Sequence, residues 1–309
     1  MIIPFWEKKI FENNNYELWQ GDCLKLTDDI PDRSIDAIIT DLPFGQTARN
    51  AWDIVIPFND YITLEVRKKP KVFYKDDFLL WCYKQGETDY NGALSYFEEN
   101  KSIGLWTQYK RIIKDNGAII LFANGMFTAD LMESNREMWK YNLIWEKTQP
   151  TGFQNANRMP MRNHEDMCVF YKKQPTYNPQ KTNGHIRKVT TASHKRNSKQ
   201  STNYNEIKNH TYDSTERFPK SVWLFAKDTQ KCALTPTQKP VALVEEIIKT
   251  YTDEGDTVLD STAGSMTTCV AAIRTARKCI CIENDEEIFN IGKNRILECV
   301  KGRCDVNIV

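Results

Sequence analysis

The strongest fold signal in the chain is TVLDSTAGSMTT, residues 257–268. Its first four residues predict a buried strand ending in a carboxylate, its small residues predict a tight turn, and residues 269–273 predict a helix. Such a turn brings the backbone close to a nucleotide-like ligand. The next predicted strand, 278–282, ends in Glu283, about 20 residues further on, where an acid accepts hydrogen bonds from ribose hydroxyls. The turn lacks the G-x-G-x-x-G spacing, which disfavours a dinucleotide-dependent oxidoreductase.

Strand-like and helix-like segments alternate along the rest of the chain. Short apolar or β-rich runs predict strands buried on both faces at 37–40, 118–122, 141–145, 167–171, 257–259 and 279–282. Apolar residues at helical spacing predict helices at 105–113 and 241–251, and Pro240 suits the first turn of the second helix. This alternation predicts an α/β domain with a mostly parallel sheet. Residues 63–104, rich in aromatic and charged side chains, break the pattern.

Length and composition exclude several classes of protein. A chain of 309 residues with 40% hydrophobic residues can form a full core and one or two domains. No apolar run approaches the roughly 18 residues of a membrane span, so no membrane partner is expected. The start, MIIPFWEKKI, is charged too early for a signal peptide.

The nine cysteines are scattered through the chain and form no C-x-x-C pair. This usage predicts reduced thiols, a cytoplasmic location and no metal site. Cys279 and Cys281 lie two residues apart in a predicted strand, so both side chains should point to one face as small core residues.

The near-neutral net charge of +1 hides an uneven distribution. Residues 151–235 hold 15 Lys and Arg residues against six Asp and Glu, while the rest of the chain is net acidic. From Met167 to Asn205 there is no acidic residue, and the basic residues there are Lys172, Lys173, Lys181, Arg187, Lys188, Lys195, Arg196 and Lys199. All four histidines also lie in residues 151–235. Such a segment is either a solvated loop region or a surface for a polyanion such as DNA.

The predicted strand 37–40 leads directly into Asp41-Leu42-Pro43-Phe44. In an open α/β sheet, ligands bind at the carboxyl ends of the strands. The Asp41 carboxylate and the Pro43 carbonyl accept hydrogen bonds and therefore suit an NH2 group, while the Phe44 ring can stack on a planar base. Taken alone, a strand end followed by a proline turn is the more common interpretation of such a motif.

Together these motifs resemble those of amino-group DNA methyltransferases. Residues 41–44 are similar to the family's D-P-P-Y/F motif, and TQKP at 237–240 followed by residues 258–265 is similar to its T-Q-K-P…V-L-D…G-S-G-T-T block. The catalytic motif comes before the cofactor motif, which is the order of the β group, whose fold is a circularly permuted class I (Rossmann-like) methyltransferase. The segments at 21–23, 151–153 and 164–165 also resemble the phage and prophage branch of the family.

The resemblance implies a role for each matched residue. Asp41 and the Pro43 carbonyl would accept hydrogen bonds from the target amine, and Phe44 would stack on the extruded base. The implied cofactor is S-adenosylmethionine, with its adenine near Asp22 and its ribose near Glu283. The other residues implied at the cofactor pocket are Asp41, Thr237, Lys239, Asp260, Ser261, Gly264, Ser265 and Asn284.

The implied activity is methylation of adenine N6 in double-stranded DNA after base flipping, as part of restriction and modification. Asp in the first position of the motif usually marks adenine, whereas Ser usually marks cytosine N4. Cytosine N4 stays open as an alternative, as do a glutamine amide in a protein and a DNA-binding protein with a degenerate cofactor site. The last alternative rests on Met266, which replaces the final glycine of G-S-G. Leu42 replaces the first proline, which costs only loop rigidity.

The implied organisation has three parts. Residues 1–150 hold the first part of the catalytic domain with the insert at 63–104, residues 151–235 form the target recognition region, and residues 236–309 hold the cofactor motif. In the recognition region, lysines would contact phosphates and polar side chains would reach base edges. The sequence leaves open whether the insert contacts DNA, a second subunit of a homodimer or the body, and whether His164 and Glu165 form a structural pair.

Overall fold

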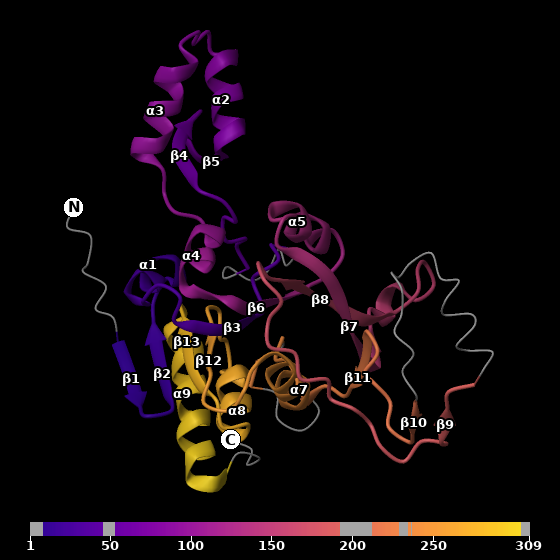
Figure 1. Cartoon of the computed structure of the whole chain (residues 1–309). Coiled ribbons are helices and arrows are strands. Elements are labelled where there is room, and N and C mark those ends of the chain that lie inside the picture. Colours follow the sequence, from indigo (N-terminus) through magenta and orange to yellow (C-terminus); the bar gives the residue numbers. More distant parts are fainter. Residues whose placement is uncertain (1–8, 46–52, 192–211, 229–233, 236, 304–309) are drawn as a thin grey trace.

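The computed structural model describes residues 9–45, 53–191, 212–228, 234–235 and 237–303. They contain a nine-stranded sheet with the order β1-β2-β13-β12-β3-β6-β8-β7-β11 (Figure 1). Its strands are β1 (Lys9–Asn13), β2 (Tyr16–Gln20), β3 (Ile35–Thr40), β6 (Ile113–Ala123), β7 (Trp139–Thr151), β8 (Arg162–Phe170), β11 (Val222–Phe225), β12 (Thr257–Asp260) and β13 (Lys278–Glu283). All six strands predicted from the sequence are therefore present.

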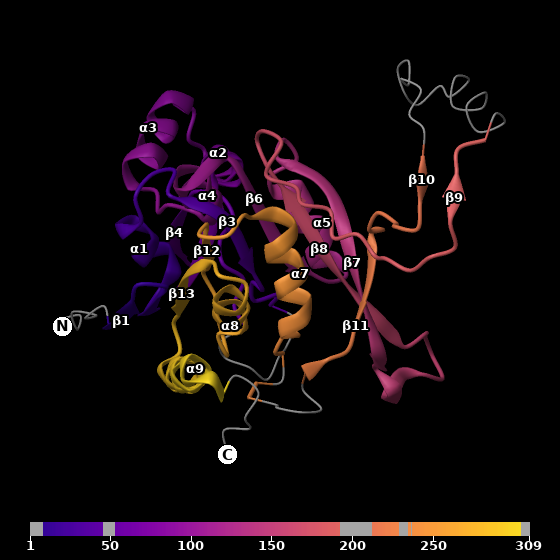
Figure 2. The same cartoon turned by 60° about the horizontal axis from the view of Figure 1, so that its bottom comes forward.

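Helices cover both faces of the sheet (Figures 1 and 2). One face carries α7 (Val241–Tyr251), α8 (Thr267–Arg274) and α9 (Glu286–Glu298), and the other carries α1 (Cys23–Leu26), α4 (Leu105–Ile112) and α5 (Met126–Ser134). The apolar stripe predicted at 241–251 is buried: Leu243, Val244, Ile247 and Ile248 are at most 1% exposed. The predicted helices at 105–113 and 241–251 are confirmed, and Pro240 is the N-cap of α7.

The central strands are parallel, as predicted. β12 pairs in parallel with β13 on one side and with β3 on the other, and β3 pairs in parallel with β6. Strand β12 thus lies beside a strand more than 200 residues earlier in the chain, with Val258 opposite Ala37. The carboxyl ends of β3, β6, β12 and β13 consequently meet at one edge of the sheet.

Strand β8 is antiparallel to both of its neighbours, β6 and β7, which makes the sheet mixed. The pairing of β6 with β8 ends at Ala123 opposite Asp166, whereas β7 and β8 continue to Thr151 opposite Arg162. The hairpin of β7 and β8 therefore extends beyond the carboxyl edge, as Figure 2 shows at its lower right.

Between β3 and α4 the chain forms a separate unit that projects from the body (Figure 1). It consists of the antiparallel hairpin β4 (Tyr61–Val66) and β5 (Lys69–Tyr74) with helices α2 (Lys75–Lys84) and α3 (Tyr90–Asn100). Its own small core contains Ile62, Phe73, Phe78 and Phe97. The segment that breaks the sequence pattern at 63–104 is thus a small unit with its own core.

The chain between β8 and β11 leaves the body as an arm, whose described part includes the short pair β9 (Lys188–Val189) and β10 (Asp213–Ser214) (Figure 2). The basic residues Lys195, Arg196 and Lys199 lie outside the described residues. None of the helices in the described part of the chain is long and apolar enough to span a membrane.

Candidate active site

A cavity of about 1160 Å³ lies at the carboxyl edge of the sheet. All twelve residues that the sequence indicated line this cavity: Asp22, Asp41, Pro43, Phe44, Thr237, Lys239, Asp260, Ser261, Gly264, Ser265, Glu283 and Asn284. The fold therefore brings the two motifs together, although they lie far apart in the sequence, at 41–44 and at 237–265. The individual roles of these residues stay predictions.

Hydrogen bonds between threonines and Asp260 join the two motifs. Thr40 Oγ1, at the end of β3, donates to Asp260 Oδ1 over 2.7 Å, and Thr268 Oγ1 donates to Asp260 Oδ2 over 2.6 Å. Thr262 Oγ1 donates to the backbone carbonyl of Asp41 over 3.0 Å. Burial raises the pKa of Asp260 to about 6, against the effect of the hydrogen bonds that Thr40 and Thr268 donate to it. Asp260 thus holds the catalytic motif against the cofactor motif.

Asp41, the first residue after β3, forms an ion pair with Lys239. Lys239 Nζ donates to Asp41 Oδ2 and also lies 3.4 Å from Glu165 Oε2. Asp41 Oδ1 is buried and accepts no hydrogen bond from any described residue. Burial raises the pKa of Asp41, and the Lys239 ammonium only partly offsets this effect. Lys239 thus holds Oδ2 of Asp41, while Oδ1 lacks a hydrogen-bond donor among the described residues.

Lys147, which is buried, extends this pair into a network with three partly buried charges, those of Asp41, Glu165 and Lys239. Its Nζ donates to Glu165 Oε1, and its ammonium lies 4.9 Å from the centre of the Trp145 ring. Burial would raise the pKa of Glu165, but Lys239 and Lys147 together lower it, so the carboxylate form is favoured. Burial likewise opposes the ammonium form of Lys239, yet Asp41 and Glu165 raise its pKa. The four groups are therefore mutually neutralised.

The aromatic and apolar residues of the catalytic motif differ in their surroundings. Phe44 is half-buried and packs on Phe127 of α5 with ring centroids 4.7 Å apart, so its orientation is fixed by the body. Leu42 is buried among the core residues under α4 and α5. Core packing therefore accounts for leucine where the family pattern has proline.

The turn after β12 is held by Glu283 at the end of β13. The backbone N–H of Gly264 donates to Glu283 Oε2 over 2.8 Å, and that of Asp285 donates to Glu283 Oε1 over 2.9 Å. Gly264 has φ +51°, and a Cβ there would meet no atom within 4 Å. The glycine therefore leaves open space beside the turn, where the sequence predicted a close approach to the cofactor.

Several predicted cofactor residues also have structural partners. Asp22 caps α1 by accepting a hydrogen bond from Leu24 N over 3.0 Å. Ser261 Oγ lies 2.5 Å from the hydroxyl of Tyr109 on α4. Ser265 Oγ donates to Gln238 Oε1 over 3.3 Å. These bonds fix the cavity wall before any ligand binds.

Met266 does adopt the left-handed conformation that its position requires, with φ +61° and ψ +35°. Its side chain is fully buried in the core and does not line the cavity. It packs over Gly292 of α9, where a Cβ would overlap Met266 Cγ. Replacing glycine by methionine therefore costs backbone strain of about 1–2 kcal/mol but leaves the cavity open.

Lys147 was not indicated by the sequence, and Glu165 was indicated only as a partner of His164. The two neighbours on β8 do not pair: Glu165 points to the lysines, while His164 is exposed. Side chains alternate across a strand, so adjacent residues could not share a partner. Lys147 falls on the face of β7 that buries Leu143 and Trp145, and this period-two spacing is the signal that could have identified it.

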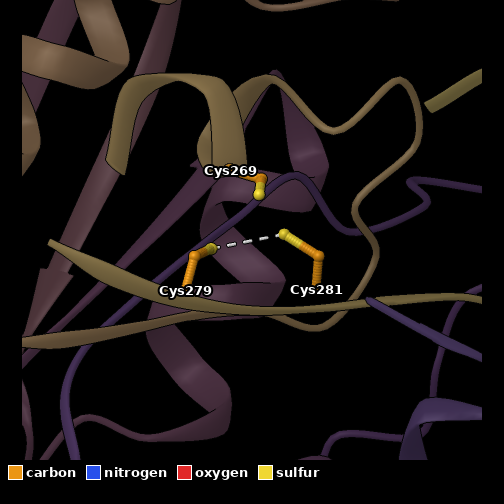
Figure 3. Close-up of side chains that lie close together, drawn as sticks. All are labelled: Cys269, Cys279 and Cys281. Carbon is orange, nitrogen blue, oxygen red and sulfur yellow. Dashed lines mark hydrogen bonds between the residues drawn. The ribbon is translucent and has the colours of Figure 1, made fainter. Parts of the chain in front are cut away.

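Cys279 and Cys281 lie on one face of β13 as predicted, and Cys269 of α8 joins them (Figure 3). The three sulfur atoms lie within 4.8 Å of one another, and those of Cys279 and Cys281 are 3.3 Å apart. All three side chains are buried in the apolar core, and burial raises the pKa of each thiol well above its usual value. The neutral thiol form is thus favoured, as for small core residues.

The arrangement of motifs is matched by known proteins. The model of the N6/N4 DNA methylase family matches residues 35–294, which include both motifs and the basic residues 151–235 between them. This chain belongs to that family. The DNA methylase is 24% identical over 310 residues to the type II methyltransferase M2.MboI of Moraxella bovis, a match that covers 96% of this chain and 92% of the relative. It is 26% identical to M2.LlaDCHI of Lactococcus lactis subsp. cremoris, over 96% and 93% of the two chains.

A shorter match is closer in sequence. The DNA adenine methyltransferase YhdJ of Escherichia coli (strain K12) is 39% identical over 84 residues, 26% of this chain and 29% of the relative. The finer resemblance to a phage and prophage branch stays a prediction.

Solved structures share the fold. The PvuII DNA methyltransferase, described as cytosine-N4-specific, superimposes with a TM-score of 0.55 at 14% identity, covering 97% of this chain and 96% of that one. The complex of M1.HpyAVI with S-adenosylmethionine gives a TM-score of 0.50 at 20% identity over 91% and 99% of the chains. The mostly parallel α/β fold of this DNA methylase is therefore that of the S-adenosylmethionine-dependent DNA methyltransferases.

Proposed function

We propose that this DNA methylase transfers a methyl group from S-adenosylmethionine to N6 of an adenine that is flipped out of double-stranded DNA into the cavity. The observation that carries the proposal is the buried Asp41 Oδ1 without a donor among the described residues. A buried acceptor that lacks a partner loses the hydrogen bonds it had with water, so a ligand that donates there binds favourably. The exocyclic amine of a base is such a donor.

Asp41 and Pro43 would act together on the amine. Both line the cavity, and each offers an oxygen that accepts a hydrogen bond. The lone pair of an exocyclic nitrogen is delocalised into the base, so acceptors on its two hydrogens favour the tetrahedral geometry that attack requires. Lys239 holds the second oxygen of Asp41 and so fixes the orientation of the carboxylate. The ring of Phe44, fixed by Phe127, would stack on the base.

The cavity residues fit the cofactor. The open space beside Gly264 and the volume of the cavity leave room for a small molecule in addition to a base. Glu283 would hold the ribose, Asp22 and Asn284 would lie at the adenine end, and the wall from Asp260 to Ser265 would enclose the methionine part. Thr237 would lie nearby with Lys239. When bound, S-adenosylmethionine supplies an electrophilic methyl group.

The choice of adenine rests on two observations of similarity. Aspartate in the first position of the catalytic motif resembles adenine-specific members, and the relative YhdJ, matched over 84 residues, is named a DNA adenine methyltransferase. The N4 amine of cytosine offers the same two hydrogens to Asp41 and Pro43, so the test must distinguish methylation of adenine N6 from methylation of cytosine N4.

The basic residues 151–235 would bind the DNA. Within the described arm, Arg187 pairs with Asp213 and Lys181 with Glu216, so these cations also stabilise the arm itself. Lys188 is exposed and forms no ion pair with any residue in the described ranges, which leaves it available to phosphate.

The test is to express the protein in cells that lack adenine methylation and to sequence their DNA with modified bases identified. N6-methyladenine at a defined site is expected. Liquid chromatography of the nucleosides distinguishes it from N4-methylcytosine, which would assign the same chemistry to the other base.

The Asp41→Ala variant should abolish the modification while DNA binding is kept, and Asp130→Ala, on the exposed side of α5, is the matched control. Full activity of Asp41→Ala would contradict the proposed mechanism. Calorimetry with S-adenosylhomocysteine gives a second readout, because absence of binding would favour a degenerate cofactor site.

A further inference from the structure

The hairpin of β7 and β8 carries its tip beyond the carboxyl edge of the sheet. Its last pair, Thr151 opposite Arg162, lies four residues of β8 past the point where β6 stops pairing. At about 3.4 Å per residue, the tip stands roughly 14 Å out from the edge at which the cavity opens. Thr151 and Arg162 themselves line the cavity. The tip therefore stands at the mouth of the active site.

The chain turns at this tip so that an aromatic ring is presented to solvent. Gly152 adopts φ +90°, and Phe153 begins a short 3-10 helix, Phe153–Asn155. The side chain of Phe153 is 81% exposed, and that of Met159 is 60% exposed. An exposed aromatic ring with a second exposed apolar side chain on the same hairpin tip is a candidate interaction site.

The tip of the hairpin is positively charged, which indicates a polyanionic partner. Residues 151–164 contain no acidic residue, and all of them are exposed. Arg158 and Arg162 form no ion pair with any residue that the structure describes. Cations of this kind attract phosphates, and an apolar side chain on the same hairpin tip can enter a base stack. An exposed phenylalanine accompanied by these two arginines therefore matches a nucleic-acid duplex.

We propose that Phe153 is a wedge that enters the duplex where the target base leaves it, and thereby lowers the cost of flipping. This inference rests on the proposed function. The ring would take the place of the lost stacking partner, while Arg158 and Arg162 hold the neighbouring phosphates. Phe153 is thus a positioning residue, because it acts on the position of the base and not on the reacting amine.

The test compares two DNA substrates that contain the target site identified by the sequencing experiment above. One is fully paired, and in the other the target base stands opposite an abasic position, where it is already unpaired and costs little to flip. Phe153→Ala should lose at least about tenfold more in single-turnover rate on the paired duplex than on the unpaired one. Phe153→Leu should recover most of this loss, since leucine also serves as a wedge.

Tyr83→Ala on α2 is the matched control, because it removes an aromatic side chain that is 72% exposed but lies on the projecting unit. Equal losses of Phe153→Ala on both substrates would overturn the wedge and assign the ring to general DNA binding, and no loss would also overturn it. Failure of the wild-type protein to methylate either substrate would instead contradict the proposed function.

Discussion

The side chain of Met266 packs over Gly292 and fills the space that a side chain at position 292 would occupy. Met266 stands where the related motif has a glycine, and it keeps the positive φ of that position. A Cβ at position 292 would also lie 3.1 Å from the carbonyl oxygen of Gly264 in the turn after β12. The pair therefore couples the core to the cavity wall.

The first prediction concerns this pair. In Gly292→Ala the added methyl group must displace Met266 or the turn at Gly264, so the free energy of unfolding should fall by about 1–3 kcal/mol. Binding of S-adenosylhomocysteine should weaken as well, as measured by calorimetry. Asn294→Ala, on the same helix, is the control. Equal unfolding free energies and equal binding of S-adenosylhomocysteine in the two variants would contradict the coupling of Met266 and Gly292 to the cavity wall.

A second prediction concerns the buried charge network. Glu165→Gln leaves the ammonium groups of Lys147 and Lys239 with only one carboxylate between them. Breaking a buried ion pair from one side costs about 3–5 kcal/mol, and urea denaturation should show a loss of this size. Adding Lys147→Met should recover part of it, because the charges balance again. Glu146→Gln on the same hairpin is the control, and additive losses in the double variant would refute the network.

The pH dependence of methyl transfer follows from Asp41. Under the proposed mechanism its carboxylate accepts from the amine in its ionised form, and burial raises its pKa. The acid limb of kcat/KM should therefore lie above the usual range of an aspartate, about 3.9. Removing the nearby ammonium in Lys239→Met should move that limb to still higher pH. The pH profiles of the single-turnover rate of the wild-type protein and Lys239→Met test this prediction. Identical acid limbs in the two profiles would contradict the proposed role of Asp41.

Asp260 provides a prediction for stability. Its pKa is about 6 in the folded protein and about 3.9 in the unfolded chain. The folded state therefore holds the proton more tightly, and its contribution to stability is greatest below about pH 4. Between about pH 4 and 6 the protein should lose about 3 kcal/mol relative to Asp260→Asn, which does not ionise. Denaturation curves at several pH values measure this difference, with Asp130→Asn as the control.

The salt dependence of DNA binding tests the basic region. Lys195, Arg196 and Lys199 lie in the stretch that contains no acidic residue. Replacing all three by alanine should reduce the slope of log affinity against log salt by roughly 0.9 for each phosphate that the protein no longer neutralises. An unchanged slope would show that these three residues do not contact DNA phosphates.

Much of the fold was predictable because its strands are buried on both faces. Continuous apolar runs such as 37–40 and 257–259 are typical of such strands, and the helix at 241–251 has a regular apolar stripe. The motif residues were predictable as a set because several spaced motifs, in the order of one family, together resemble that family. All of them line one cavity.

The remaining features depend on contacts that no local pattern contains. The network of Lys147, Glu165 and Lys239 joins three separate segments, and no local pattern shows that these charges meet. The compensation of Met266 by Gly292 likewise depends on how α9 packs on α8. The antiparallel course of β8 could not be read from its apolar run, because a buried strand has the same composition in either direction.

The projecting unit has a neck that is closed by the backbone. Tyr61 N donates to Ser102 O over 3.0 Å and Ser102 N donates to Tyr61 O over 2.7 Å, so the chain leaves and re-enters the body at one point. Gly104 lies directly against Asn59, where a side chain would clash with the backbone. Evolution could therefore gain, lose or exchange everything beyond this neck in a single event without shifting the register of the sheet, as a cassette within a methylase gene.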